Sequence, residues 1–186
     1  ATYLVSTTSR KKTETIRIAL AGGGIKDSSI EPEEEPNPDR IPVTEAHKRG
    51  VTDPMTASLV RVPGSADPLG PQACQGSMAI FDGRMRYELR LAYKRMETVK
   101  ADKGYHGAAV VCAVFFTPIA GYVPDRAAIK YLAAQRDMEV WFAPIAGTRV
   151  LVPFKVKIPT PLGTGVLEAT QFVVNAAVPQ AASRTH

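Results

Sequence analysis

Long apolar runs are missing from this sequence of 186 residues. The longest one, Ala108–Phe116, spans nine residues. A membrane-spanning helix needs about 20 consecutive apolar residues, so no segment qualifies as one. We therefore expect a soluble chain with no transmembrane segment.

Side chains for metal or covalent chemistry are also scarce, with three histidines and two cysteines in the whole chain. The histidines show no zinc-binding spacing, among themselves or with the cysteines. Gly22–Gly24 lacks the lysine spacing and the following Ser or Thr of a phosphate-binding loop, so it is interpreted as a turn. No serine stands in the Gly-x-Ser-x-Gly pattern of hydrolases. The sequence assigns no catalytic, cofactor-binding or metal-binding residue.

The charge balance is moderately basic, with 23 Lys and Arg against 18 Asp and Glu, a net charge of +5. This balance favours anionic partners such as a cell-envelope surface. Nucleic acid is not an expected partner, because single-strand binders need aromatic and basic side chains on one face. In the strand predicted around Tyr87 and Tyr93, the tyrosines share a face with leucines, as core residues do, and the arginines lie on the opposite face.

The length fits one domain with its own hydrophobic core. Residues 1–178 are predicted to form a single β-rich domain, and residues 179–186 a tail. Residues 31–42 form an acidic, Pro-rich loop in which repulsion between carboxylates and stiff prolines favour an extended, solvated connection. The same prolines argue against a calcium site, which needs a chain that curls around the ion.

Period-two alternation is the main structural signal. From Met85 to Tyr93 the odd positions are apolar and most even positions are charged, which predicts a half-buried strand. Met96 is apolar on an even position, so the phase slips by one residue. A β-bulge at Lys94 or Arg95 would absorb the extra residue and keep Tyr93 and Met96 on the same side.

The remaining patterns favour more strands and little helix. The strand from Met85 pairs with 108–116 through a turn at 102–104, and a second hairpin covers 139–158. Further strands are predicted within 13–20 and from 163 to 174, and short helices at 53–59 and 124–132. Pro144 and Pro153 are expected near an edge or at bulges. The predicted fold is all-β, with a strongly curved antiparallel sheet or partly open barrel and one to three short helices.

The two cysteines, Cys74 and Cys112, form either one disulfide or two buried thiols. We favour the disulfide, because Cys74 lies among Gly, Pro and Gln, where a buried structural thiol is unusual. A disulfide requires oxidising surroundings such as the periplasm.

An ordered series of short motifs resembles the proteobacterial domain-of-unknown-function family 3108, in the form found in alphaproteobacteria of the Rhizobiales group. The series runs through Ile80–Leu89, which contains Asp82, Gly83, Arg84 and Tyr87, then Lys103–Tyr105, Cys112, Trp141–Pro144 and Arg149–Pro153. The resemblance implies an exported, β-rich cell-envelope protein. Turn geometry explains Asp82-Gly83, since Gly adopts positive φ and Asp bonds its own backbone. Trp141 is a core candidate.

The resemblance also implies a signal peptide and further strands before Ala1, so this chain is expected to be the C-terminal portion of such a protein. Ala1–Thr8 would then present unpaired backbone groups, and Tyr3, Leu4 and Val5 carry no protecting charge. We expect self-association through this edge, and a monomer once the upstream strands are added.

Two function classes follow. The first is a non-catalytic, exported, periplasmic envelope protein whose curved sheet holds a lipid or other apolar ligand. A deep apolar cavity open to solvent would favour this class. The second is a hydrolase of envelope polymers that uses Asp82, Glu88 or Glu168, which would require two of these carboxylates to face each other across a cleft.

Overall fold

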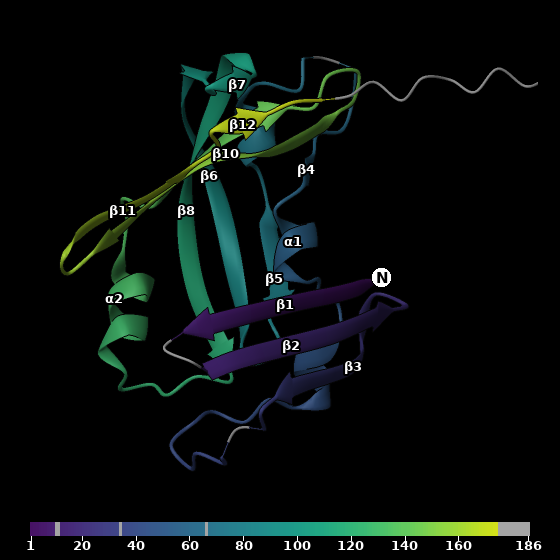
Figure 1. Cartoon of the computed structure of the whole chain (residues 1–186), viewed down its shortest axis with the longest axis vertical. Helices are drawn as coiled ribbons and strands as arrows, with labels where there is room; N and C mark the ends of the chain where they lie inside the picture. Colours follow the sequence, from purple (N-terminus) through teal and green to yellow (C-terminus); the bar gives the residue numbers. More distant parts are fainter. Residues whose placement is uncertain (10–11, 34, 66, 175–186) are drawn as a thin grey trace, which may run out of the picture.

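Antiparallel strands make up most of the structure. The computed structural model describes residues 1–9, 12–33, 35–65 and 67–174 (Figure 1). Its largest unit, the main sheet, has the strand order β11-β10-β9-β8-β6-β5, and the short β4 pairs with β10. The strands are β4 (Val60–Arg61), β5 (Ser77–Phe81), β6 (Arg86–Lys100), β8 (His106–Ala120), β9 (Glu139–Pro144), β10 (Val150–Thr160) and β11 (Gly163–Glu168).

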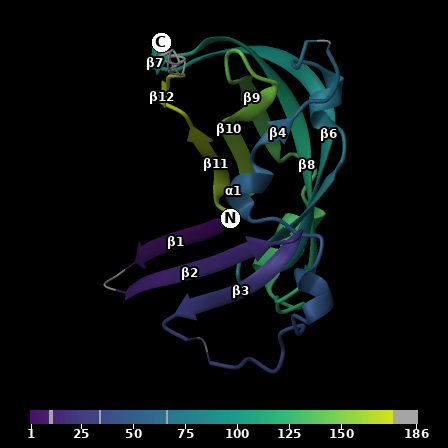
Figure 2. The ribbon, with the colours of Figure 1, turned by 90° about the vertical axis from the view of Figure 1, so that its right-hand side faces the viewer.

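The main sheet curls into a half-barrel (Figure 2), and all pairs within it are antiparallel. This confirms the predicted all-β fold with a strongly curved antiparallel sheet. One face of the sheet carries Leu91, Val114 and Val140 and is called the cavity face below. The other face carries Trp141 and is called the outer face.

The predicted bulge lies in β6. Tyr93 pairs with Cys112 and Arg95 pairs with Val111, so Lys94 is the extra residue in the ladder. Directly opposed residues share a face, and Met96 pairs with Val110, two residues from Cys112 on β8. Tyr93 and Met96 therefore lie on the same side, as predicted.

The expectation that Tyr93 is a core residue is wrong. Tyr93 and Met96 are each 40% exposed, although they share the cavity face with buried Leu91. Period two identifies the face of a strand, but a face is buried only where another element covers it. The cover over this part of β6 is incomplete, so both side chains contact solvent.

The second predicted hairpin is also present. Strands β9 and β10 pair antiparallel, and their register shifts between Pro153 and Lys155. Pro153 thus lies beside a bulge, where its missing N–H is tolerated. Pro144 ends β9 opposite Leu151.

A smaller sheet has the order β1-β2-β3 and is formed by β1 (Thr2–Ser9), β2 (Lys12–Ala21) and β3 (Gly24–Glu31). Strand β1 is an edge strand. Ile16 and Ile18 of β2 pack with Phe81 of β5 in one buried cluster. The small sheet therefore packs against one end of the main sheet (Figure 1). The sequence analysis did not predict β3, because its Lys26–Ser29 segment is polar.

The helices are short. They are α1 (Pro54–Ala57), α2 (Ala127–Ala134) and the 3₁₀ turns η1 (Glu45–Lys48) and η2 (Pro71–Cys74). The Asp53 carboxylate accepts hydrogen bonds from the backbone N–H groups of Met55 and Thr56, both at 2.9 Å, so Asp53 caps α1 as predicted. The sequence predicted that the second helix begins at Pro124. Helix α2 begins three residues later, at Ala127.

The predicted last strand is interrupted. After β11, the chain forms β12 (Gln171–Phe172), which pairs in parallel with β7 (Lys103–Gly104) and differs from the antiparallel expectation. Phe172 packs over the outer face with Tyr105 and Phe154. The proposed domain end at residue 178 and the tail 179–186 lie outside the described residues.

Candidate ligand-binding cavity

The cavity face of the main sheet forms the wall of a half-open cavity of about 460 Å³. Cross-strand pairs bring its apolar side chains together: Leu89 with Phe116, Leu91 with Val114, and Val140 with Val156. Directly opposed side chains in a sheet lie close enough to form a continuous surface. The sheet residues that line the cavity are Met78, Ile80, Tyr87, Leu89, Leu91, Val114, Phe116, Glu139, Val140, Phe142, Pro153, Val156, Lys157 and Ile158.

Two helices border this wall. From α1, Pro54, Ala57 and Ser58 reach the cavity, and from α2, Ile129 and Leu132 do. Ile129 and Leu132 are three residues apart, so both project from one side of α2. Because both are only half-buried, α2 flanks the cavity without closing it.

Tyr87 brings a hydroxyl into this apolar surface. Its ring lies 5.5 Å from that of Phe116, measured between centroids. Burial, with a further contribution from the negative charge of Asp82, raises the pKa of the Tyr87 hydroxyl well above its usual range. Tyr87 therefore remains an uncharged hydrogen-bonding group at neutral pH.

The turn after β5 closes one end of the cavity. The Asp82 carboxylate accepts hydrogen bonds from the N–H groups of Arg84 and Met85, at 2.9 and 2.7 Å. Gly83 has a φ of 100°, which favours glycine, and a Cβ there would lie 2.4 Å from Cγ2 of Ile16. Arg84 forms an ion pair with Glu14 of β2. The turn thus joins the cavity to the small sheet.

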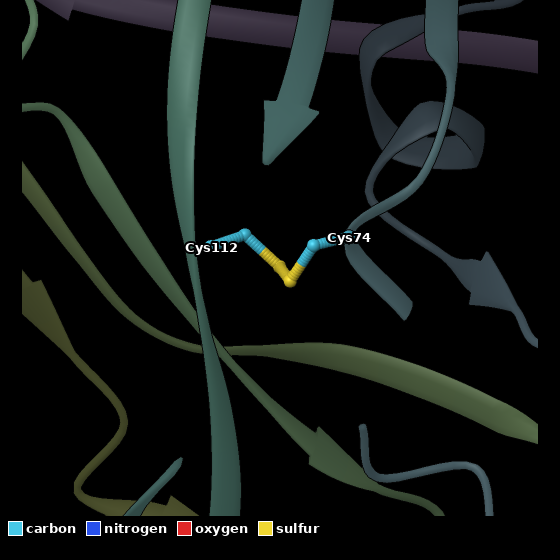
Figure 3. Close-up of a disulfide and its surroundings, with 2 residues drawn as sticks. All are labelled: Cys74 and Cys112. Atoms are coloured by element: carbon cyan, nitrogen blue, oxygen red, sulfur yellow. A yellow bond between two sulfur atoms is a disulfide. The ribbon is translucent and has the colours of Figure 1, made fainter. Parts of the chain in front are cut away.

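A disulfide between Cys74 and Cys112 holds the segment before β5 on the cavity face (Figure 3). It confirms the pairing that the sequence favoured. Both cysteines are buried, at 2% and 0% exposed, in a cluster that also contains Leu91, Val140 and Phe142 of the cavity wall. The disulfide therefore fixes the covering segment where the cavity meets the packed core.

The outer face carries a cluster of charges that the sequence analysis missed. Glu139 is 5% exposed, and its Oε1 lies 2.5 Å from Lys94 Nζ and 2.9 Å from Arg95 Nη1. Glu97 accepts a hydrogen bond of 2.6 Å from Trp141 Nε1 and a second of 2.6 Å from Arg95 Nε. Trp141 is 4% exposed, so it is a core residue with a satisfied indole N–H.

These contacts keep both carboxylates ionised. The hydrogen bond from Arg95, together with Lys94, lowers the pKa of Glu139 to about 2, against the opposing effect of burial. The hydrogen bond from Trp141 is the main cause of the lowered pKa of Glu97, followed by Arg95. Glu97 and Glu139 are therefore bound anions without a proton to donate at neutral pH.

The three carboxylates considered for hydrolysis have separate partners. Asp82 binds the backbone of its own turn, Glu88 forms an ion pair with Arg86 at 3.0 Å, and Glu168 forms one with Lys155 at 3.1 Å. Among the contacts found in the described residues, none joins any two of these three carboxylates. The same residues contain no group of three or more His, Cys, Asp or Glu that could hold a metal ion.

Comparison with known proteins adds the family. Residues 2–170 match the model of the family described as "Protein of unknown function (DUF3108)". The chain is a member of the DUF3108 family. No curated protein and no solved structure shows a significant match to this DUF3108 chain. Among its described residues, no helix is both long and apolar enough to span a membrane.

Proposed function

We propose that this DUF3108 protein is a non-catalytic binding protein of the cell envelope that holds a lipid acyl chain, or a similar elongated apolar ligand, in the cavity. The observation that carries the proposal is the half-open cavity of about 460 Å³ with its apolar wall. Its volume lies within the range of about 300–1,000 Å³ that is common for small-molecule sites.

The chemistry of the wall favours an acyl chain. Each buried CH₂ group of a ligand contributes about 0.8 kcal/mol, so a chain along this surface gains affinity without any polar contact. Two charged groups that line the cavity already have partners: Asp82 binds backbone N–H groups, and Glu139 binds two cations. Tyr87 is neutral. Lys157 also lines the cavity and makes no ion pair with any described residue, so the wall accepts an acyl chain and can also contact an acidic headgroup.

The disulfide supports the proposed location in the periplasm. Cys74 and Cys112 are both buried, and disulfides persist mainly in oxidising compartments. The test is the mass of natively purified, unreduced protein after alkylation. Two alkylated cysteines would refute both the native disulfide and the argument for export that depends on it.

The hydrolase alternative has no comparable support. Glycoside hydrolysis by two carboxylates requires a pair roughly 5–10 Å apart on either side of the scissile bond. Glu88 and Glu168 are each neutralised by a basic neighbour, and Asp82 is occupied by its turn. We therefore retain the binding protein as the proposed function.

The proposal includes two further interactions of the protein, one with anionic surfaces and one with a second copy of the chain. The net charge of +5 favours contact with anionic envelope surfaces. Strand β1 is an edge with Leu4 58% exposed, and such an edge can pair with a second chain. Self-association through β1 remains a prediction.

The proposal is tested by titrating the protein with a fluorescent long-chain fatty acid in solution. We expect saturable binding that Leu132→Glu, which places a charge beside the cavity, weakens at least tenfold. The matched control is Leu59→Glu, because Leu59 is 51% exposed and does not line the cavity. Native mass spectrometry of protein from its own envelope should show a bound lipid. No binding by the unmodified protein, or equal binding by both variants, would refute the proposal.

A further inference from the structure

The hairpin formed by β10 and β11 extends beyond the rest of the main sheet (Figure 1). Strand β9 begins at Glu139, which is opposite Lys157, so residues 158–165 pair only with each other. We call residues 156–167 the arm. Every residue of β11 is exposed, which is unusual for a strand of a seven-stranded sheet.

The arm exposes large apolar side chains instead of charges. Leu162 is 101% exposed, Leu167 76% and Val166 55%. The ten residues from 158 to 167 include no charged side chain. Exposed apolar groups that are contiguous, unlike scattered ones, mark a surface that contacts a partner or a membrane.

The two faces of the arm differ. Val140 of the cavity wall is opposite Val156, and Val156 is opposite Leu167, so these residues share the cavity face. Ile158 follows two residues later on the same face and itself lines the cavity. The apolar cavity face therefore continues onto the base of the arm as far as Ile158 and Leu167. Gly165, Thr160 and Gly163 follow on this face before the turn that carries Leu162.

The other face carries basic side chains together with Val166, which is opposite Lys157. Lys155 and Lys157 alternate with Val156 and Ile158, so they project from the outer face at the base of the arm, and Lys157 also reaches the rim of the cavity. Glu168 pairs with Lys155, and Lys157 makes no ion pair with any described residue, which leaves one positive charge here. Phosphate groups at a bilayer surface are complementary to this charge.

The tip of the arm is held in a defined turn. The Thr160 hydroxyl donates a hydrogen bond of 2.8 Å to the Gly163 carbonyl and accepts one of 3.3 Å from the Leu162 N–H. These contacts satisfy polar groups of the turn internally, which lowers the cost of moving it into a less polar environment. Pro161 and Leu162 are thereby presented outward.

We propose that the arm docks on a phospholipid bilayer, with Leu162 in the acyl-chain boundary and Lys157 at the phosphates, and that its apolar face conducts a lipid chain between the bilayer and the cavity. The conducting role rests on the proposed function, whereas docking does not depend on it. A second copy of the chain is the competing occupant, and the experiment below separates the two.

Docking is measured by sedimentation of the full chain with large unilamellar vesicles of phosphatidylethanolamine and phosphatidylglycerol. Burial of a leucine contributes about 1.5–3 kcal/mol, so Leu162→Asp should reduce the partition coefficient at least tenfold. Met55→Asp is the matched control, because Met55 is 66% exposed on α1 and does not line the cavity. Lys157→Gln should weaken binding at low salt and have little effect at high salt.

Three outcomes would overturn the docking surface: no vesicle binding by the unmodified protein, equal loss in Leu162→Asp and Met55→Asp, or a stable dimer that Leu162→Asp converts to a monomer. Transfer is measured with a fluorescent fatty acid loaded in the vesicles. Leu162→Asp should slow its transfer to the protein at least tenfold, while binding of the free fatty acid in solution stays within twofold. If free fatty acid does not bind at all, the proposed function fails, and vesicle docking is still decided by the sedimentation result.

Discussion

The disulfide between Cys74 and Cys112 should contribute a large share of the stability of the chain. It joins residues 38 positions apart. In the chain-entropy description, closing a loop of this length removes about 13 cal/mol/K from the unfolded state, or about 4 kcal/mol at 25 °C. For a protein of this size, such a loss corresponds to a fall in Tm of about 8–16 °C.

Burial of both sulfur atoms simplifies the interpretation. Cys74 and Cys112 lie in a cluster with Val62, Leu91 and Phe142, so reduced thiols can remain packed in place. The difference between oxidised and reduced protein should therefore reflect mainly the freedom of the unfolded chain. The double variant C74A/C112A should lose slightly more, because it also removes two sulfur atoms from the cluster.

The assay is urea unfolding of the oxidised protein, the reduced protein and C74A/C112A, followed by tryptophan fluorescence from Trp141. Addition of reductant to C74A/C112A is the control and should change nothing. A reduced protein whose free energy of unfolding lies within about 1 kcal/mol of the oxidised one would refute the loop argument. It would mean that, in the unfolded chain, the residues around Cys74 stay close to those around Cys112 even without the disulfide.

Three further predictions concern other parts of the fold. Gly83→Ala should lower the free energy of unfolding in urea more than Gly147→Ala does. Both sites have positive φ, which costs about 1–3 kcal/mol for alanine, but of the two only Gly83 also lacks space for a Cβ. Equal losses would contradict the close approach of Gly83 to Ile16. The pKa of Glu139 is about 2 in the folded protein and 4.5 ordinarily, so the stability that it contributes is present above pH 4.5 and is lost as the pH falls toward 2. The free energy of unfolding of Glu139→Gln should therefore fall less on acidification than that of the unmodified protein. An unchanged pH profile would argue against the ion pairs. Leu4→Lys should suppress self-association in light scattering, whereas a chain that is already monomeric would show that the β1 edge is covered.

Local patterns in the sequence predicted the strands whose faces are chemically distinct. The alternation from Met85 and the phase slip before Met96 located β6 and its bulge, because both depend only on neighbouring residues. Strand β3 was missed, since Asp27, Ser28 and Ser29 have no apolar face of their own and depend on pairing with β2. Tyr93 was misplaced for a related reason: the covering of a face is a property of the whole fold.

The candidate site was harder to predict from the sequence than the strands were. The charge cluster joins Arg95 to Glu139 and Glu97 to Trp141, in each case across 44 residues. Their meeting depends on the register of β6, β8 and β9, which no local pattern contains. The cavity has the same origin, because Leu89, Phe116 and Val156 are ordinary strand residues until curvature brings them around one space. Only the border formed by Ile129 and Leu132 has a local origin, because residues three apart in a helix share one side.

The bulge at Lys94 also explains how one carboxylate can be held by two consecutive residues. In a regular strand, Lys94 and Arg95 would project to opposite faces. The extra residue turns both toward Glu139, so each cation reaches the same oxygen atom. Deleting one residue here would restore a regular ladder yet leave a buried anion with a single cation. The length of this strand is therefore fixed by electrostatics as well as by register, and β6 should tolerate substitutions on its exposed positions far better than any change in its number of residues.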